Sequence, residues 1–158
     1  MATTYTASAT VAPGASATKG LFQLTTASTT PLRLCALDIS MDGGATSFWP
    51  QFKLLRAAGS FTAATGGNSV TAQYANADGN LVAAQSTPKS GTFTAELAVG
   101  SGTLVTLTQW YLPNSSGLFY QWPLGRELVV PVSACISLQT ITPASFANNI
   151  NVTIMWEE

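Results

Sequence analysis

The sequence predicts an all-β protein, an antiparallel β-sandwich of about eight to ten strands with a jelly-roll-like arrangement. Apolar and polar residues alternate along many short segments, most clearly near the C-terminus, where Ile150, Val152, Ile154 and Trp156 are separated by single residues that are mostly polar. This period of two is typical of a strand with one buried and one solvated face. Turn-forming residues separate the segments, and no stretch has convincing spacing for a long helix. These observations together indicate a sandwich.

The predicted strands follow one another along most of the chain. Leu32–Met41 is apolar on both faces and is predicted to be a central strand, closed by a hairpin-type turn at Asp42-Gly43-Gly44. Pro50 cannot donate a ladder hydrogen bond, so the strand at 47–56 is expected at a sheet edge or bulged there. The segments 59–68 and 70–81 are expected to be loops, the second with at most one short turn. The other predicted strands are 22–25, 92–97, 103–112, 118–122, 127–130, 134–141 and 149–157.

The length of 158 residues fits a single domain. We assign residues 19–158 to one β-sandwich domain. Residues 1–18 are rich in Ala, Thr and Ser, and they are expected to form an edge strand around Thr4–Val11 or an arm that orders only on a neighbouring molecule. We find no internal repeat, heptad pattern or linker.

The composition is unusual in its lack of charge. Only 8% of the residues are charged, against about 25% in a typical soluble domain, and the net charge is −1. Such a surface resists association weakly, so the composition favours a subunit of a larger assembly. The six basic residues are scattered, which argues against nucleic-acid binding. No apolar stretch is long enough for a membrane span, and the N-terminus lacks the pattern of a secretory signal, so we expect synthesis in the cytoplasm.

The chain has little equipment for chemistry. It contains no histidine, so neither a serine–histidine catalytic site nor a Cys/His zinc cluster is predicted. Asp38, Glu96 and Glu127 could supply the carboxylate pair of a glycosidase, but no local motif surrounds them. Asp42 and Asp78 lie in Gly-containing turns, where Asp usually bonds its own backbone rather than calcium. We therefore predict no enzyme activity and no catalytic, cofactor-binding or metal-binding residue.

The two cysteines, Cys35 and Cys135, lie a hundred residues apart. They could be bridged between sheets, but free thiols are expected in a cytoplasmic product. The alternation places Cys135 opposite the apolar set that includes Ala134 and Ile136.

Large apolar side chains break the expected polarity of the outer faces in three segments. Trp49 shares a face with Gln51 and Lys53. In 104–111, alternation places Leu104 and Trp110 on one face and Val105, Leu107 and Tyr111 on the other. In 118–122, Phe119 lies opposite Leu118, Tyr120 and Trp122. Exposed aromatic groups mark interfaces unless loops such as 59–68 or 76–90 cover them. The predicted interface residues are Trp49, Leu107, Trp110, Tyr111, Phe119 and Trp122.

Several segments resemble a known group of proteins. Trp110-Tyr111-Leu112-Pro113, the run Gln121-Trp122-Pro123-Leu124-Gly125-Arg126-Glu127-Leu128-Val129-Val130-Pro131, and the terminal Trp156-Glu157-Glu158 resemble small virion proteins of tailed bacteriophages, the capsid decoration or cement proteins. The stretch Leu21-Phe22-Gln23-Leu24-Thr25 followed by Leu32-Arg33-Leu34 is also similar to that group. The resemblance implies a β-sandwich, usually a homotrimer, that sits on the outer capsid surface and binds the major capsid protein. It implies no active site.

The sequence therefore leads to one expected function and one alternative. The expected function is a structural virion protein that decorates and stabilises a phage head. The alternative is a receptor- or glycan-binding head of a phage fibre or tail, in which Tyr111, Asn114 and Trp122 are candidate sugar contacts. Strand order, the oligomer axis and the face that meets the capsid do not follow from the sequence.

Overall fold

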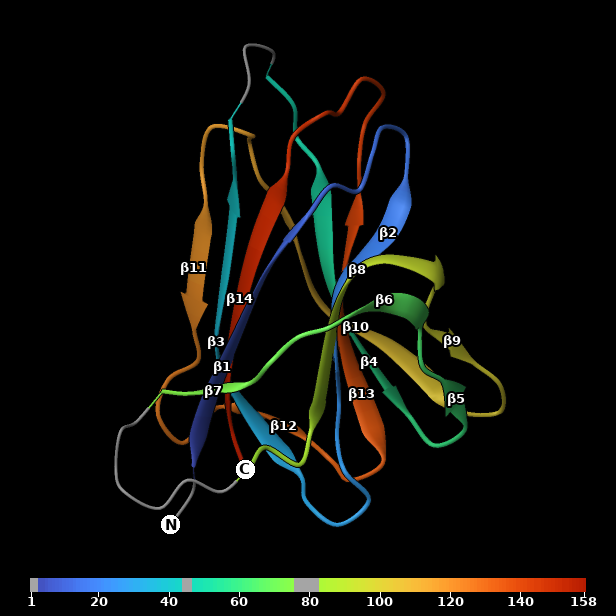
Figure 1. Cartoon of the computed structure of the whole chain (residues 1–158), viewed down its shortest axis with the longest axis vertical. Coiled ribbons are helices and arrows are strands. Elements are labelled where there is room, and N and C mark those ends of the chain that lie inside the picture. The colour runs from blue at the N-terminus through green and yellow to red at the C-terminus, as the bar shows by residue number, and fades with distance from the viewer. Residues whose placement is uncertain (1–2, 44–46, 76–82) are drawn as a thin grey trace.

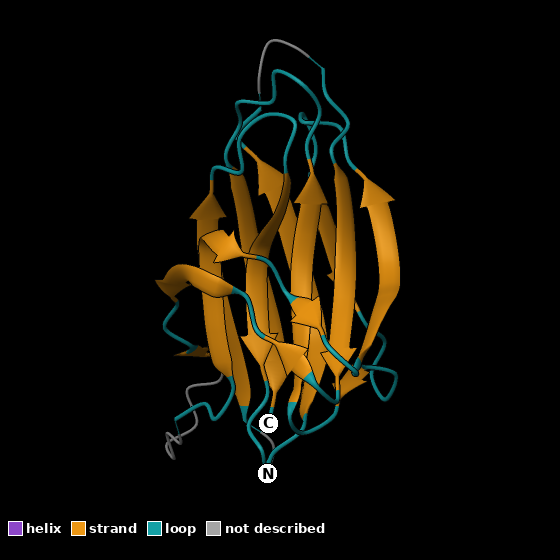
Figure 2. Ribbon diagram, turned by 90° about the vertical axis from the view of Figure 1, so that its right-hand side faces the viewer, coloured by secondary structure: helices purple, strands orange, loops and turns teal. Residues whose placement is uncertain are grey.

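The computed structural model is an all-β, antiparallel sandwich, as the alternating pattern predicts (Figure 1). It describes residues 3–43, 47–75 and 83–158. Two six-stranded sheets pack face to face, and Figure 2 shows the long strands of the sandwich running side by side along its long axis. A jelly-roll arrangement in particular stays a prediction, because the strand order alone establishes only the sandwich.

The first sheet has the strand order β11-β3-β14-β1-β7, with β12 also paired to β3. Its strands are β1 (Thr4–Val11), β3 (Leu32–Met41), β7 (Gln73–Tyr74), β11 (Leu118–Gln121), β12 (Leu128–Val130) and β14 (Ile150–Glu157). Strand β1 pairs with β14 over all eight of its residues and with β7 at Tyr5 and Thr6. Of the two roles expected for the N-terminal region, residues 4–11 therefore take that of a strand within the sheet.

The second sheet has the order β10-β4-β13-β2-β8-β6. Its strands are β2 (Thr18–Thr25), β4 (Gln51–Ala58), β6 (Thr65–Ser69), β8 (Thr87–Ala95), β10 (Thr103–Tyr111) and β13 (Ala134–Ile141). A small third sheet pairs β5 (Phe61–Thr62) with β9 (Ala98–Val99). The strand signals at 59–69 are weak because the segment is rich in Gly and Thr, and the expected loop there is wrong. Of the segment expected to be a loop at 70–81, residues 76–81 lie outside the described residues, and Gln73–Tyr74 form the short strand β7 rather than a loop.

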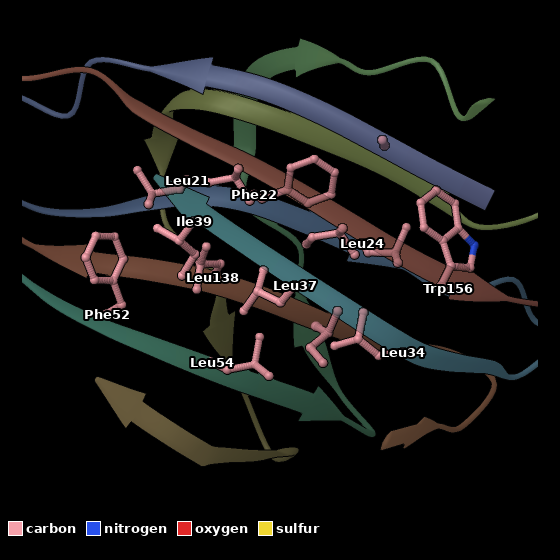
Figure 3. Packing of buried hydrophobic residues seen from close by; sticks show 14 of the residues in the cluster. Leu21, Phe22, Leu24, Leu34, Leu37, Ile39, Phe52, Leu54, Leu138 and Trp156 are labelled. Atoms are coloured by element: carbon pink, nitrogen blue, oxygen red, sulfur yellow. The ribbon is translucent and has the colours of Figure 1, made fainter. Parts of the chain in front are cut away.

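The core between the sheets is built from the inward-facing residues of both (Figure 3). Trp156, at the end of β14, is completely buried, and its ring stacks on that of Tyr5 at a centroid distance of 5.7 Å. The alternation at the C-terminus thus predicts the buried set correctly: Ile150, Val152, Ile154 and Trp156 all belong to the core. The expectation of a central strand at Leu32–Met41 is also confirmed, since β3 lies between β14 and the pair β11 and β12.

Two turn-related predictions are wrong. The chain does not return in a hairpin after Met41, because β3 belongs to the first sheet and β4 to the second. The connection crosses between the sheets instead. Pro50 does not mark an edge strand either: β4 begins at Gln51 and lies between β10 and β13. Pro50 precedes the strand, where its carbonyl accepts a hydrogen bond from the Leu112 N–H at 3.3 Å and no ladder donor is needed.

The outer face of the second sheet carries a second buried layer. Ala57 and Cys135 are fully buried, but they lie outside the core cluster between the sheets. The segment that carries β5 covers this face, where the Ala64 N–H donates to the buried Gln23 side chain at 2.8 Å. Figure 1 shows β5 and β9 on that outer side. Residues 59–68 therefore do cover apolar surface, but Trp49 and Tyr111 stay exposed.

Candidate functional site

The most conspicuous surface is the side of the sandwich where β10 and β11 form the edges of the two sheets. Among the described residues, β10 pairs only with β4, and β11 pairs only with β3. Between Glu96 and Arg126 no residue is charged. Edge strands of soluble proteins usually carry charges or proline to prevent pairing with other chains. Neither strand has a charged residue or a proline, so this edge lacks the usual protection, apart from the bulge described next.

A bulge in β10 decides which residues face outward. The pairing with β4 shifts between Thr106 and Thr108, so that Leu107 is the extra residue. Trp110 is paired with the core residue Phe52, whereas Leu104 is paired with Ala57 on the outer side of the sheet. Strict alternation places Leu104 and Trp110 on one face and Val105 with Tyr111 on the other, and that prediction is wrong. The bulge leaves Trp110 with Val105 on the inner face and Leu104 with Tyr111 on the outer face.

The centre of this edge is a cluster of three rings from both sheets. The ring centroid of Trp110 in β10 lies 6.1 Å from that of Tyr120 in β11. Tyr120 in turn makes an edge-to-face contact with Trp122, with 4.8 Å between the ring centroids. These distances are typical of stabilising aromatic pairs. Trp110 and Trp122 are half-buried and pack against the core, as does Leu107. The cluster joins the two sheets at their open side. Leu107, Trp110 and Trp122, three of the predicted interface residues, therefore also contribute to the fold.

Three other predicted interface residues are freely presented. Trp49 is 60%, Tyr111 59% and Phe119 67% exposed. Tyr111 lies on the outer face of the second sheet and Phe119 on the outer face of the first, opposite Asp38, so they flank the ring cluster on its two sides. We call Trp110, Tyr111, Phe119, Tyr120 and Trp122 the aromatic edge. Tyr120 was not among the predicted interface residues, although it shares a face with Trp122; its position at the sheet edge leaves it 39% exposed.

Tyr111 is held in place by its neighbours. The side-chain amide of Gln51 donates to the Tyr111 hydroxyl at 2.9 Å and to the side-chain Oε1 of Gln109 at 3.2 Å. These bonds tie the ring to the outer face of the sheet through neutral groups. A ring that is already fixed loses little conformational entropy when a partner covers it, which favours binding.

Two of the carboxylates considered for chemistry hold backbone N–H groups, and a third holds side-chain amides. Glu96 accepts a hydrogen bond from the Gly20 N–H at 2.7 Å, and Glu127 accepts one from the Gly125 N–H at 2.8 Å. The side-chain amides of Asn149 and Asn151 each donate a hydrogen bond to the Asp42 carboxylate. Asp78 lies outside the described residues. Within the described ranges no group of three or more His, Cys, Asp or Glu residues is placed to hold a metal ion, and no helix could cross a membrane.

Both cysteines are free thiols, and they belong to different sheets. Burial raises the pKa of the Cys135 thiol from its ordinary value of 9.0 to about 12. Burial, with the nearby carboxylates of Glu157 and Glu127, raises the pKa of Cys35 to about 11. Because the thiolate is the reactive form, neither thiol is activated for nucleophilic chemistry.

The raised thiol pKa predicts a loss of stability in alkali. The folded protein favours the neutral thiol, so this stabilisation is fully present below pH 9 and is lost as the pH rises toward about 12. Urea unfolding at increasing pH should show the free energy of unfolding falling above pH 9. In Cys135→Ala the fall should be smaller, and an identical fall would show that other groups cause it. In parallel, a thiol reagent should label Cys135 only after unfolding.

The structural role of the ring cluster predicts a stability loss for Trp110→Ala. The substitution removes a half-buried ring that packs against both the core and Tyr120. We expect the free energy of unfolding to fall by about 2–3 kcal/mol, below the value for fully buried aromatic residues. Tyr111→Ala, on the exposed side of the same strand, should change it by about 0.5 kcal/mol or less. Urea denaturation of the two variants measures the difference, and equal losses would contradict the bulged register.

The described residues of this edge form a surface suited to binding. It combines an uncharged strand edge, three half-exposed rings and two exposed rings, of which Tyr111 is held by hydrogen bonds. Aromatic residues of this kind are the ones most often found at the energetic centres of protein interfaces. Compared with known proteins, the chain matches no family model, no curated protein and no solved structure.

Proposed function

We propose that this protein is a structural virion protein, a capsid decoration or cement protein that binds the outer surface of a tailed-phage head. The observation that carries the proposal is the aromatic edge, an exposed apolar surface in a chain with very little charge. The segments that resemble decoration proteins contribute to this surface, since Trp110-Tyr111 ends β10, Gln121 ends β11 and Trp122 comes directly after it. Under this proposal the partners are further copies, as a homotrimer, and the major capsid protein.

The proposed mechanism depends on binding energy alone. A protein that binds the assembled lattice better than the free subunits stabilises the lattice by mass action. A standard interface buries about 1,600 Å² in total, and three copies joined together bind with higher avidity than one. Contacts between uncharged groups are weakened little by salt, because screening acts on charges. The low charge of the aromatic edge is thus suited to a particle that meets varying ionic strength.

The glycan-binding alternative has less support. Asn114, one of the expected sugar contacts, is buried and accepts a hydrogen bond from the Phe48 N–H at 3.3 Å. Trp122 is half-buried and packs against Tyr120. Of the three candidate sugar contacts only Tyr111 presents its ring to solvent, and its hydroxyl already accepts the hydrogen bond from Gln51.

The proposal is tested by adding the purified protein to heads of the phage whose genome encodes it, and imaging the particles by electron cryomicroscopy. Density on the outer surface of the head, together with greater resistance of the head to osmotic shock, is the expected result. Density only at the fibre or tail tip would support the receptor-binding alternative. Particles that carry no additional density would overturn both proposals.

A further inference from the structure

We infer that copies of this protein associate head to tail, with Lys53 of one copy paired to Asp38 of the next. This inference refines the self-association contained in the proposed function by naming the contact. It follows from the unequal division of charge between the two sheets and from the places of Lys53 and Asp38 on opposite outer faces, beside the aromatic edge.

The few charges of this chain are divided unequally between the two sheets. The described strands of the second sheet hold four basic residues and no acidic one. The four are Lys19, Lys53, Arg56 and Lys89. The described strands of the first sheet hold Asp38, Glu157 and Arg33. Because the two sheets form opposite sides of the sandwich (Figure 1), the molecule has a basic side and an acidic side.

Lys53 faces outward on the basic side. Its chain neighbours Phe52 and Leu54 belong to the core, so alternation directs Lys53 to the outer face of the second sheet. There it lies between Gln109 of β10 and Gln139 of β13, which are both neutral. Among the described residues no hydrogen bond or ion pair engages its ammonium group. The side chain is half-exposed, so its charge is available to a partner.

Asp38 has the corresponding place on the acidic side. Its chain neighbours Leu37 and Ile39 belong to the core, so Asp38 lies on the outer face of β3, where it is exposed. Phe119 of β11 and Thr153 of β14 are its cross-strand neighbours. Within the described ranges its carboxylate takes part in no hydrogen bond or ion pair. Since β3 and β4 each lie one strand in from the aromatic edge, the two charges have matching positions on opposite faces.

The other charges on these faces leave the difference of sign in place. On the outer face of the second sheet Lys89 adds a second positive charge, and Glu96, whose carboxylate accepts a backbone hydrogen bond, offsets one of the two. On the first sheet Arg33 and Glu157 are cross-strand partners and offset one another. Asp42, directly after β3, adds a negative charge that its hydrogen bonds to neutral amides do not cancel. The two faces therefore keep opposite signs.

This complementarity selects a second copy as the partner, because every copy supplies both charges. An exposed ion pair contributes little affinity by itself, but opposite charges fix the orientation of a contact, and like charges in their place repel. Because the two sides that meet are different, the association is head to tail, and it closes into a ring when the rotation between copies allows it. The homotrimer of the proposed function is such a ring of three.

The rings beside the two charges supply apolar area to the contact. Phe119 lies directly opposite Asp38. Tyr111 lies two residues along β10 from the cross-strand partner of Lys53, and such diagonal neighbours are about 7–8 Å apart. The contact therefore covers the near side of each exposed ring and gains from the area removed from water. It also brings the aromatic edges of neighbouring copies side by side, which extends the surface proposed to bind the head.

The first experiment measures the molar mass of the full chain by light scattering over a range of concentrations. Lys53→Glu and Asp38→Lys each place like charges opposite one another in the contact, so each should weaken self-association at least about tenfold. Lys89→Glu makes the same change of charge on β8, away from the aromatic edge, and is the matched control that should keep the wild-type mass. All three side chains reach solvent, so the variants should keep the wild-type melting temperature. Rising ionic strength should weaken the wild-type association, because salt screens the pair.

Reversing both charges tests the pairing itself. The double variant Lys53→Glu with Asp38→Lys has complementary charges again, in exchanged places, and should regain most of the lost association. A mixture of the two single variants should also associate, because the reversed group of one then faces the reversed group of the other. Lys53→Cys with Asp38→Cys should further give intermolecular disulfides under mild oxidation, whereas Lys89→Cys with Asp38→Cys should not.

The outcomes separate this inference from the proposed function. A wild-type chain that stays monomeric at all concentrations would overturn the inference. An oligomer that the single reversals leave unchanged, or that the double reversal fails to restore, would overturn it as well. In each of these cases head binding, measured in parallel, decides the decoration role independently. Conversely, an oligomer that depends on Lys53 and Asp38 but binds no head would support the inference and count against the proposed function.

Discussion

A chain that lacks residues 1–11 is expected not to fold. β1 pairs with β14 along its whole length, and its removal would expose the core next to Trp156. Tyr5, Ala7 and Val11 of this strand are buried in the core. The loss of three buried side chains and an eight-residue ladder is comparable with the whole net stability of a domain, about 5–15 kcal/mol. Circular dichroism and urea titration should show no cooperative unfolding transition.

A matched pair of point variants tests the same claim without shortening the chain. Ala7 faces the core and Ser8 faces solvent, where its hydroxyl lies 2.8 Å from that of Thr153. Ala7→Asp should unfold the protein or lower its stability by about 3 kcal/mol or more, since it buries an unpaired charge. Ser8→Asp should have a small effect. If the truncated chain and Ala7→Asp both showed the same cooperative unfolding transition as the wild type, residues 4–11 would be a dispensable arm.

The strands that the sequence predicts best are those in which burial alone decides the pattern. Leu32–Met41 and Ala134–Ile141 were expected with the bounds that the structure has, and both lie inside sheets. Neighbours on both sides fix such strands, and their side chains must be apolar wherever they face another layer. The alternation near Trp156 is informative for the same reason. In these segments local sequence and global fold agree.

The predictions fail where a position depends on distant segments. The bulge at Leu107 reverses the faces of β10, yet it exists only in the register with β4. The connection between the sheets after Asp42 has the sequence of a hairpin turn, because Asp-Gly occurs both in hairpin turns and in connections between sheets. The pair β5 and β9 forms a small third sheet although neither strand has a strong pattern of its own. Sequence alternation also cannot show that Trp110 and Tyr120 meet, since they come from different sheets.

The sequence predicted which residues contribute to the candidate surface better than it predicted how exposed each of them is. Trp49, Tyr111 and Phe119 were expected to be exposed, and they are. Leu107, Trp110 and Trp122 are half-buried and pack against the core, so their substitution affects folding as well as any interface. This division gives the proposed function its most direct test, because the exposed rings can be changed without disturbing the sandwich.

The double variant Tyr111→Ser with Phe119→Ser is expected to lose most of its affinity for phage heads while it keeps the wild-type melting temperature. Both rings are more than half exposed in the protomer, so their removal costs the fold little. An aromatic residue at the centre of an interface typically contributes 2 kcal/mol or more, so each substitution should weaken binding by roughly 30-fold. Co-sedimentation with purified heads measures the affinity, and Gln73→Ala on β7, at the other edge of the first sheet, is the control.

The comparison with Trp110→Ala then separates binding from folding. That variant should lose stability first, and its head binding should follow the fraction of protein that remains folded. The double variant should lose binding with no change in the folded fraction. If the double variant bound heads as tightly as the wild type, the aromatic edge would not be the capsid-binding surface. The exposed rings would then need another partner, because an uncharged edge that carries them gains stability only when something covers it.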